Sequence, residues 1–134
     1  MSTLQRLARF LVRLDYDALP EEVRRAARFQ ILNLLAAASH PSHEADAVAR
    51  AYAHQSSGGR SHVIATGACL EPAAAAAVNA ASSMAHDFDD IVWMGHTCHS
   101  AVFASLAVAE HEGCSSAELV TAVVAANEAA GRLG

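Results

Sequence analysis

The amino-acid sequence predicts an all-α fold, a bundle-like domain of about six helices with at most one short strand. Three observations on the 134-residue chain indicate this. Hydrophobic residues make up 53% of it but aromatic residues only 5%, so small apolar side chains dominate. Alanine-rich segments favour helices that approach one another closely. Apolar residues also recur at helical spacing along most of the chain. We expect residues 1–134 to form one domain.

The N-terminal third predicts three helices. The first is expected over residues 2–14, where Ser2 and Gln5 make a capping-box pattern. Pro20 is well placed to begin a second helix, which ends at Pro41. A weaker third helix follows at roughly 43–55. The second helix is apolar on two sides, so we expect it to be buried over most of its surface. These sides are Val23, Ala27, Ile31, Leu34 and Leu35, and Phe29, Leu32 and Ala36.

The remaining elements follow a glycine-containing loop at 56–59. The only strand-like run is 62-HVIA-65. Pro72 opens an alanine helix that reaches about residue 85, and a buried helix of small residues is expected from 99 to 110, closed by Gly113. Ser115 and Glu118 make a second capping box at the start of the last helix. The inner stripe of that helix is Leu119, Val120, Val123, Val124 and Ala126.

Composition excludes several classes of function. The formal net charge is -5 and there is no basic run, so no nucleic-acid partner is expected. All nine basic residues are arginines, which excludes a Schiff-base lysine in this chain. Cys69, Cys98 and Cys114 form no zinc or disulfide pattern, so we expect reduced thiols and a cytoplasmic location. No segment resembles a signal peptide or a membrane span, and no membrane partner is expected.

One segment, 86-HDFDDIVWMGHTCH-99, concentrates three histidines, three aspartates and the only tryptophan. Because it joins two predicted buried helices and carries Val92, Trp93 and Met94, we expect it to be partly buried. Buried imidazoles and carboxylates need partners, and such clusters are frequent at functional sites.

Four interpretations of this segment are open. The simplest is a solvated loop whose polar side chains cap the helices. A metal site is the second, but the spacing matches no zinc or iron signature, so we expect no metal and no cofactor. The third is general acid–base chemistry, which needs only His96 or His99 and one nearby carboxylate. A nucleophilic Cys98 is weaker still, since no activating partner can be assigned.

Five segments share their pattern with one enzyme family. They are 7-LARFLVRLDYDALPEEVRRAARFQILNLLA-36, 63-VIATG-67, 79-NAASSMAHDFDD-90, 95-GHTCHSAVFASLAVAE-110 and 128-EAAGRLG-134. They resemble the N-terminal part of the helical domain of the MmgE/PrpD family, which includes 2-methylcitrate dehydratase and cis-aconitate decarboxylase. The resemblance covers nearly the whole chain, and DFDD followed by GH at this distance is its most specific part.

The resemblance implies a metal-independent lyase that acts on a small-molecule substrate, in the family a small polycarboxylate. Asp87, the first acid of DFDD, and His96, the loop histidine, would line the active site. Asp90 would support the loop. We expect His96 to transfer the proton next to a carbonyl or carboxyl group, with Asp87 orienting it or carrying a second proton transfer. The expected substrate contacts are Trp93, Ile91, His99 and His86.

Departures from the family pattern leave three hypotheses. Ile91 replaces the usual threonine, Met84 replaces a histidine, and the family's substrate-binding lysines have no counterpart in this sequence. In the first hypothesis, the chain is a dehydratase-like enzyme or one subunit of a split enzyme. Its partner is then a second chain that carries the remaining family half, a further copy of itself, or both. Alternatively, it is an isomerase or cyclase for a less charged natural-product intermediate. The third hypothesis is a non-catalytic helical partner subunit.

Overall fold

The protein is described by a computed structural model that covers residues 1–40, 42–53, 58–85, 87–91 and 95–133. Within these ranges it has six helices and one antiparallel pair of two-residue strands, which confirms the all-α fold class. None of the described helices is both long and apolar enough to cross a membrane. The elements are α1 (Thr3–Leu11), α2 (Glu21–Ala38), α3 (His43–Ala53), β1 (Ser61–His62), β2 (Cys69–Leu70), α4 (Pro72–Met84), α5 (Thr97–Glu112) and α6 (Ser116–Leu133).

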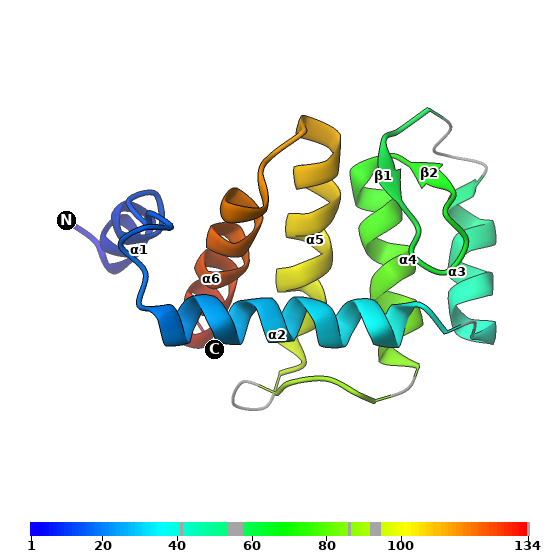
Figure 1. Ribbon diagram of the computed structural model, residues 1–134, viewed down its shortest axis with the longest axis horizontal. Helices are drawn as coiled ribbons and strands as arrows, with labels where there is room; N and C mark the ends of the chain where they lie inside the picture. Colours follow the sequence, from blue (N-terminus) through cyan, green and yellow to red (C-terminus); the bar gives the residue numbers. More distant parts are fainter. Residues whose placement is uncertain (41, 54–57, 86, 92–94, 134) are drawn as a thin grey trace.

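Helices α3, α4, α5 and α6 lie side by side, and the long α2 crosses α4, α5 and α6 near one end (Figure 1). The strand pair packs against α5 and α4, and α1 contacts α6. The core lies where α2 meets α5 and α6, and its members are mostly medium-sized or small. Its fully buried apolar side chains include Leu34, Cys98, Val102, Phe103 and Val123.

Local signals placed the helix ends well. Ser2 and Gln5 form the predicted capping box of α1, with the Gln5 N–H donating to Ser2 Oγ at 3.2 Å. Ser115 and Glu118 do the same before α6. Gly113 ends α5 in the left-handed region with φ 73°, a conformation that favours glycine. One boundary differs in a way that matters for the site, because α5 begins at residue 97, two residues before the expected start.

The prediction that α2 is buried over most of its surface is wrong. Ala27, Ile31 and Leu34 are buried as expected, but Phe29 and Leu32 are 65% and 61% exposed. The physical reason is the crossing geometry. A helix laid across the ends of others contacts them with one face only, so its second apolar side stays at the surface (Figure 1).

The predicted strand at 62–65 is shorter than expected and has a partner that the sequence did not indicate. Only Ser61 and His62 form β1, and they pair with β2 through Leu70 and Cys69. At Gly59 the backbone approaches β2 so closely that a Cβ would lie 1.9 Å from the Leu70 carbonyl oxygen. A side chain at that position would therefore force the strand pair apart.

Candidate active site

The loop between α4 and α5 is attached to α2 by two side-chain amides. Asn33 Nδ2 donates to the Phe88 carbonyl oxygen at 2.8 Å, and Gln30 Nε2 donates to Asp90 Oδ2 at 3.2 Å. Asp87 starts this stretch with φ 51° and is the only non-glycine residue with a positive φ in the described part of the chain. Aspartate tolerates this left-handed conformation better than most residues. These contacts set the direction of the acid that follows Phe88.

The Asp89 side chain contacts the first turn of α5. Its side chain is only 3% exposed. His96 Nδ1 lies 2.6 Å from Asp89 Oδ2, a short charge-assisted hydrogen bond. His99 Nε2 lies 3.0 Å from the same oxygen, and Cys98 Sγ donates to it at 3.7 Å. One carboxylate oxygen of Asp89 therefore contacts two imidazoles and a thiol.

The two imidazoles differ in access. His96 occupies the N-cap position of α5 and its side chain is 47% exposed, whereas the side chain of His99 is 4% exposed. Their rings stack with centroids 6.4 Å apart. His99 Nε2 faces Asp89 outside hydrogen-bond geometry, so this contact is electrostatic. Its other nitrogen, Nδ1, lies 2.7 Å from Ser83 Oγ on α4.

Two opposing effects act on the Asp89 carboxyl group. Burial alone would raise its pKa, because a charged carboxylate loses hydration. The hydrogen bond from His96, the electrostatic interactions with His99 and His96, and the hydrogen bond from the Cys98 thiol all lower it. The lowering effects together outweigh burial, so the pKa of Asp89 lies below its ordinary value. Asp89 is therefore an ionised acceptor at neutral pH.

Cys98 does not have the properties of a nucleophile. Its side chain is fully buried, and this burial raises the pKa of the thiol, with the negative charge of Asp89 acting in the same direction. At neutral pH it is a thiol rather than the reactive thiolate. The nearest donor atoms of Asp89, Cys98 and His99 all lie within 4.8 Å of one another, which is compatible with a metal ion. The expectation that the protein needs no metal stays a prediction.

A second imidazole–carboxylate pair lies between β1 and α5. His62 Nδ1 is 2.9 Å from Glu110 Oε1, and the backbone N–H of His62 donates to Glu110 Oε2 at 2.7 Å. Here the carboxylate is 26% exposed rather than buried. Because Glu110 holds both the backbone and the ring of one residue, this pair fixes the strand to the helix.

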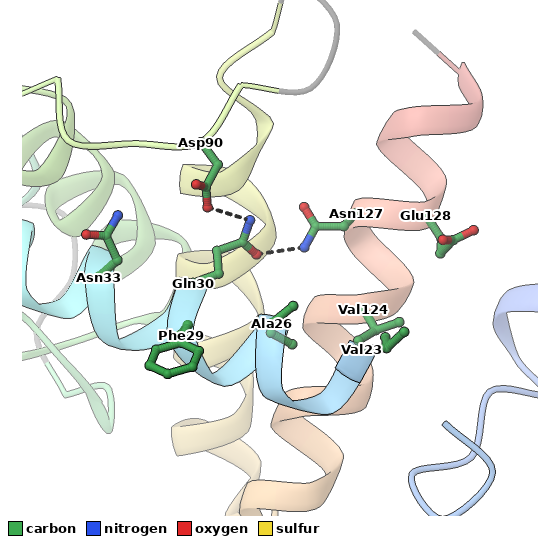
Figure 2. Close-up of a pocket in the computed structure, with 10 residues that line it drawn as sticks. Val23, Ala26, Phe29, Gln30, Asn33, Asp90, Val124, Asn127 and Glu128 are labelled. Atoms are coloured by element: carbon green, nitrogen blue, oxygen red, sulfur yellow. Dashed lines mark hydrogen bonds between the residues drawn. The ribbon is translucent and has the colours of Figure 1, made fainter. Parts of the chain in front are cut away.

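A pocket of about 500 Å³ opens where α2 and α6 meet the 87–91 loop. Figure 2 shows its polar end, where Asp90, Gln30 and Asn127 form a hydrogen-bonded chain with Gln30 in the middle. Val23, Ala26, Ala27, Phe29, Asn33, Val124 and Glu128 also line it. Asp89 and Asp90 thus point in different directions, one toward α5 and the other into this pocket.

The sequence-predicted site residues have different outcomes. His96 and His99 are brought together with a carboxylate, but the acid that contacts them is Asp89 and not the predicted Asp87. Asp87 and Ile91 are exposed in the same loop, and their roles stay predictions. His86 and Trp93 lie outside the described residues.

No local pattern distinguishes Asp89 from its neighbours. It stands two residues after Asp87 and one before Asp90 in an irregular loop, where side-chain directions follow no fixed period. The direction of each acid depends on amide contacts from α2, 55 and 60 residues away in the sequence. The second site residue missed was Ser83, whose partner His99 lies on another helix.

The fold and the site together define a helical domain with a half-exposed imidazole held by a buried carboxylate. The chain matches the MmgE/PrpD N-terminal domain over residues 5–134 and belongs to this family. No curated protein and no solved structure matches it.

Proposed function

We propose that this chain carries the acid–base residues of a dehydratase-like lyase, with His96 as the proton acceptor and Asp89 as the residue that positions it. The observation that supports this most directly is the 2.6 Å contact between His96 Nδ1 and the buried Asp89 Oδ2. Because Nδ1–H donates to Asp89, neutral His96 keeps its lone pair on Nε2. That atom belongs to a half-exposed ring and can take a proton from a bound substrate.

The proposed substrate is a small hydroxy acid. The proton on the carbon next to the carbonyl or carboxyl group moves to His96 Nε2, and the released electron pair forms a carbon–carbon double bond. The hydroxyl group on the neighbouring carbon leaves as water after it receives a proton. Asp89 stabilises the imidazolium ion that forms, because its negative charge faces the ring. We propose Asp87 for the second proton transfer and Ile91 for apolar contact with the substrate.

Deuterium exchange tests the first proton transfer without knowledge of the complete reaction. The protein is incubated in D₂O with a set of small hydroxy acids, including di- and tricarboxylates. Proton NMR then follows loss of the signal next to the carboxyl group. We expect exchange with at least one member of the set. A His96→Gln variant should lower the rate about 100-fold or more, because a positioned general base contributes about 10²–10⁴-fold.

His62→Gln is the matched control for this experiment. The His62 ring is 51% exposed and also contacts a carboxylate, but it belongs to the β1–α5 contact. We expect its exchange rate to equal that of the unchanged protein. A folded His96→Gln variant that exchanges the proton at full rate would contradict the proposal. Asp87→Asn should keep proton exchange while it slows formation of the double bond, which ultraviolet absorbance measures.

The exposed surface of the loop favours a second candidate, an isomerase or cyclase for a less charged substrate. Phe88 and Ile91 are 67% and 59% exposed beside the acids. Uncharged hydroxy ketones added to the same exchange experiment decide between the two substrate classes. Exchange of the ketones that is lost in the His96→Gln variant, without exchange of the polycarboxylates, supports this second candidate.

A further inference from the structure

Behind Asp89 lie a second imidazole and a hydroxyl group that the mechanism above does not use. We propose that Ser83 and His99 form a buried polar relay that holds Asp89 ionised and thereby fixes the tautomer of His96. The relay consists of a hydrogen bond between Ser83 and His99 and an electrostatic contact between His99 and Asp89. Ser83 and His99 are both positioning residues, because they act on His96 only through Asp89. Their proposed contribution to catalysis rests on the proposed function, whereas the polar relay itself does not.

The contacts determine which atoms of the relay carry a hydrogen. His99 Nε2 lies 3.0 Å from the ionised Asp89 Oδ2, so it must carry a hydrogen, since a lone pair there would be repelled. A neutral imidazole then accepts at Nδ1. The hydroxyl of Ser83, 2.7 Å away, is the donor to this nitrogen. Ser83 therefore points its hydrogen at His99, and His99 points its hydrogen at Asp89. His96 points its hydrogen at the same carboxylate.

Ser83 also has a second possible acceptor. Its Oγ lies 3.1 Å from the carbonyl oxygen of Ala80 in its own helix, a longer contact than the one to His99. The single hydroxyl hydrogen can serve only one acceptor at a time. The shorter contact and the hydrogen required on His99 Nε2 both direct it toward His99.

The order Ser83, His99, Asp89 repeats the connectivity of a hydrolytic triad, but burial excludes that role. Ser83 has 0% relative exposure and His99 has 3%, so neither can meet a substrate. A nucleophilic serine must reach the carbonyl carbon that it attacks. The three groups instead form a polar path through the packed contact between α4 and α5.

The relay acts by offsetting the cost of burying Asp89. A carboxylate with 3% exposure is destabilised unless donors replace its lost hydration. If His99 no longer faces it, this carboxylate either takes up a proton or turns out of the cluster. In both cases His96 loses its anionic acceptor at Nδ1, and the ring can adopt the Nε2–H tautomer. That tautomer has no lone pair on Nε2 and cannot accept the substrate proton there.

Long-range proton–nitrogen NMR on ¹⁵N-labelled protein reads the tautomer of His96 directly, at a pH where this ring is neutral. We expect Nδ1–H in the unchanged protein and a shift toward Nε2–H in His99→Leu. His99→Gln should retain Nδ1–H, because its amide can accept from Ser83 and donate to Asp89. Ser83→Ala should move the tautomer in the same direction as His99→Leu.

Ser82→Ala is the matched control for Ser83→Ala. Ser82 is the neighbouring residue of α4, is equally buried, and donates to the Val78 carbonyl oxygen of the same helix. The Ser82→Ala substitution should leave the His96 tautomer unchanged. A merely structural role of Ser83 would give the two alanine variants the same His96 spectrum, and this result would overturn the relay. The relay is also overturned if His99→Leu folds and keeps His96 as Nδ1–H.

The exchange assay separates the relay from the proposed function. If both hold, His99→Leu slows proton exchange roughly 10–100-fold, as loss of an orienting partner does, and His99→Gln restores it. If the tautomer shifts as expected but no substrate exchanges in the unchanged protein, the relay is supported and the proposed function fails. Circular dichroism and urea unfolding establish that each variant is folded before its tautomer is read.

Discussion

At the scale of single residues, the decisive feature is which aspartate points inward. Asp87 and Asp90 are exposed, and Asp89 between them is nearly inaccessible. Chain spacing alone does not settle this, because the loop is held by Asn33 and Gln30 from a distant helix. The sequence therefore indicated that these histidines lie near a carboxylate, but not that this carboxylate is Asp89.

The lowered pKa of Asp89 makes protein stability depend on pH. A carboxyl group with a lower pKa in the folded state stabilises the protein fully above its unfolded pKa, about 3.9. This contribution is lost as the pH falls through the lower folded pKa. We expect Asp89→Asn to lose about 1–3 kcal/mol of unfolding free energy at neutral pH, as a buried donor set loses its charged acceptor.

Urea unfolding of Asp89→Asn and the unchanged protein over a range of pH measures this effect. The difference in unfolding free energy between the two proteins should become smaller as the pH falls below about 4. Asp17→Asn, in an exposed turn, is the control and should stay within about 0.5 kcal/mol of the unchanged protein. A difference that grows on acidification would mean that the folded pKa of Asp89 is raised rather than lowered.

Cys98 provides a test of burial at the same site. Cys69 and Cys114 are exposed, whereas Cys98 is buried and its pKa is raised. Iodoacetamide at neutral pH should therefore modify the two exposed thiols in the folded protein and leave Cys98 intact. Mass spectrometry of the peptides measures the extent, and urea should make all three reactive. Modification of Cys98 at the rate of Cys69 would show an accessible thiolate and revive the nucleophile hypothesis.

At the scale of elements, features that depend on neighbouring residues could be predicted from the sequence, and features that depend on distant residues could not. Ser2, Gly113 and Ser115 act on residues at most five positions away, so the sequence alone located three helix ends. The pairing of β1 with β2 depends instead on contacts from helices. Asn79 of α4 donates to the His62 carbonyl oxygen and accepts from the N–H of Ile64, both at 2.8 Å.

This bridging role predicts a large cost for removing the Asn79 side chain. Asn79 is 2% exposed, and Asn79→Ala leaves a backbone carbonyl and a backbone N–H without their partner. We expect a loss of about 2–4 kcal/mol in urea unfolding, since each unsatisfied group costs about 1–3 kcal/mol. Asn33→Ala is the comparison, because its exposed amide can be replaced by water at a cost below about 1 kcal/mol. Equal losses for the two variants would contradict this reasoning.

At the scale of the whole molecule, the crossing of α2 leaves an apolar surface that the sequence analysis assigned to the core. Phe29 and Leu32 lie three residues apart on its outer side. Phe88 and Ile91 are also exposed, and the loop that carries them is attached to α2 through Asn33 and Gln30. Helical periodicity identified these apolar residues correctly. It could not show that the helix crosses its neighbours and contacts them with one face only.

We predict that a second copy of the chain covers this surface. Two copies related by a two-fold axis would bring Phe29 and Leu32 of each together. The helices would then run antiparallel, so that Arg25 of one copy lies near the acidic 87–90 loop of the other. Opposite charges at the edge of an apolar contact favour this arrangement.

Sedimentation velocity over a range of concentrations tests the pairing against the 14.0 kDa mass of one chain. We expect the unchanged protein to sediment as a dimer at high concentration. The double variant Phe29→Glu, Leu32→Glu should remain monomeric, because two carboxylates of each copy would meet in the contact. Val108→Glu is the control: this side chain is 52% exposed near the far end of α5, and the variant should still dimerise. An unchanged protein that stays monomeric at every concentration would contradict this pairing.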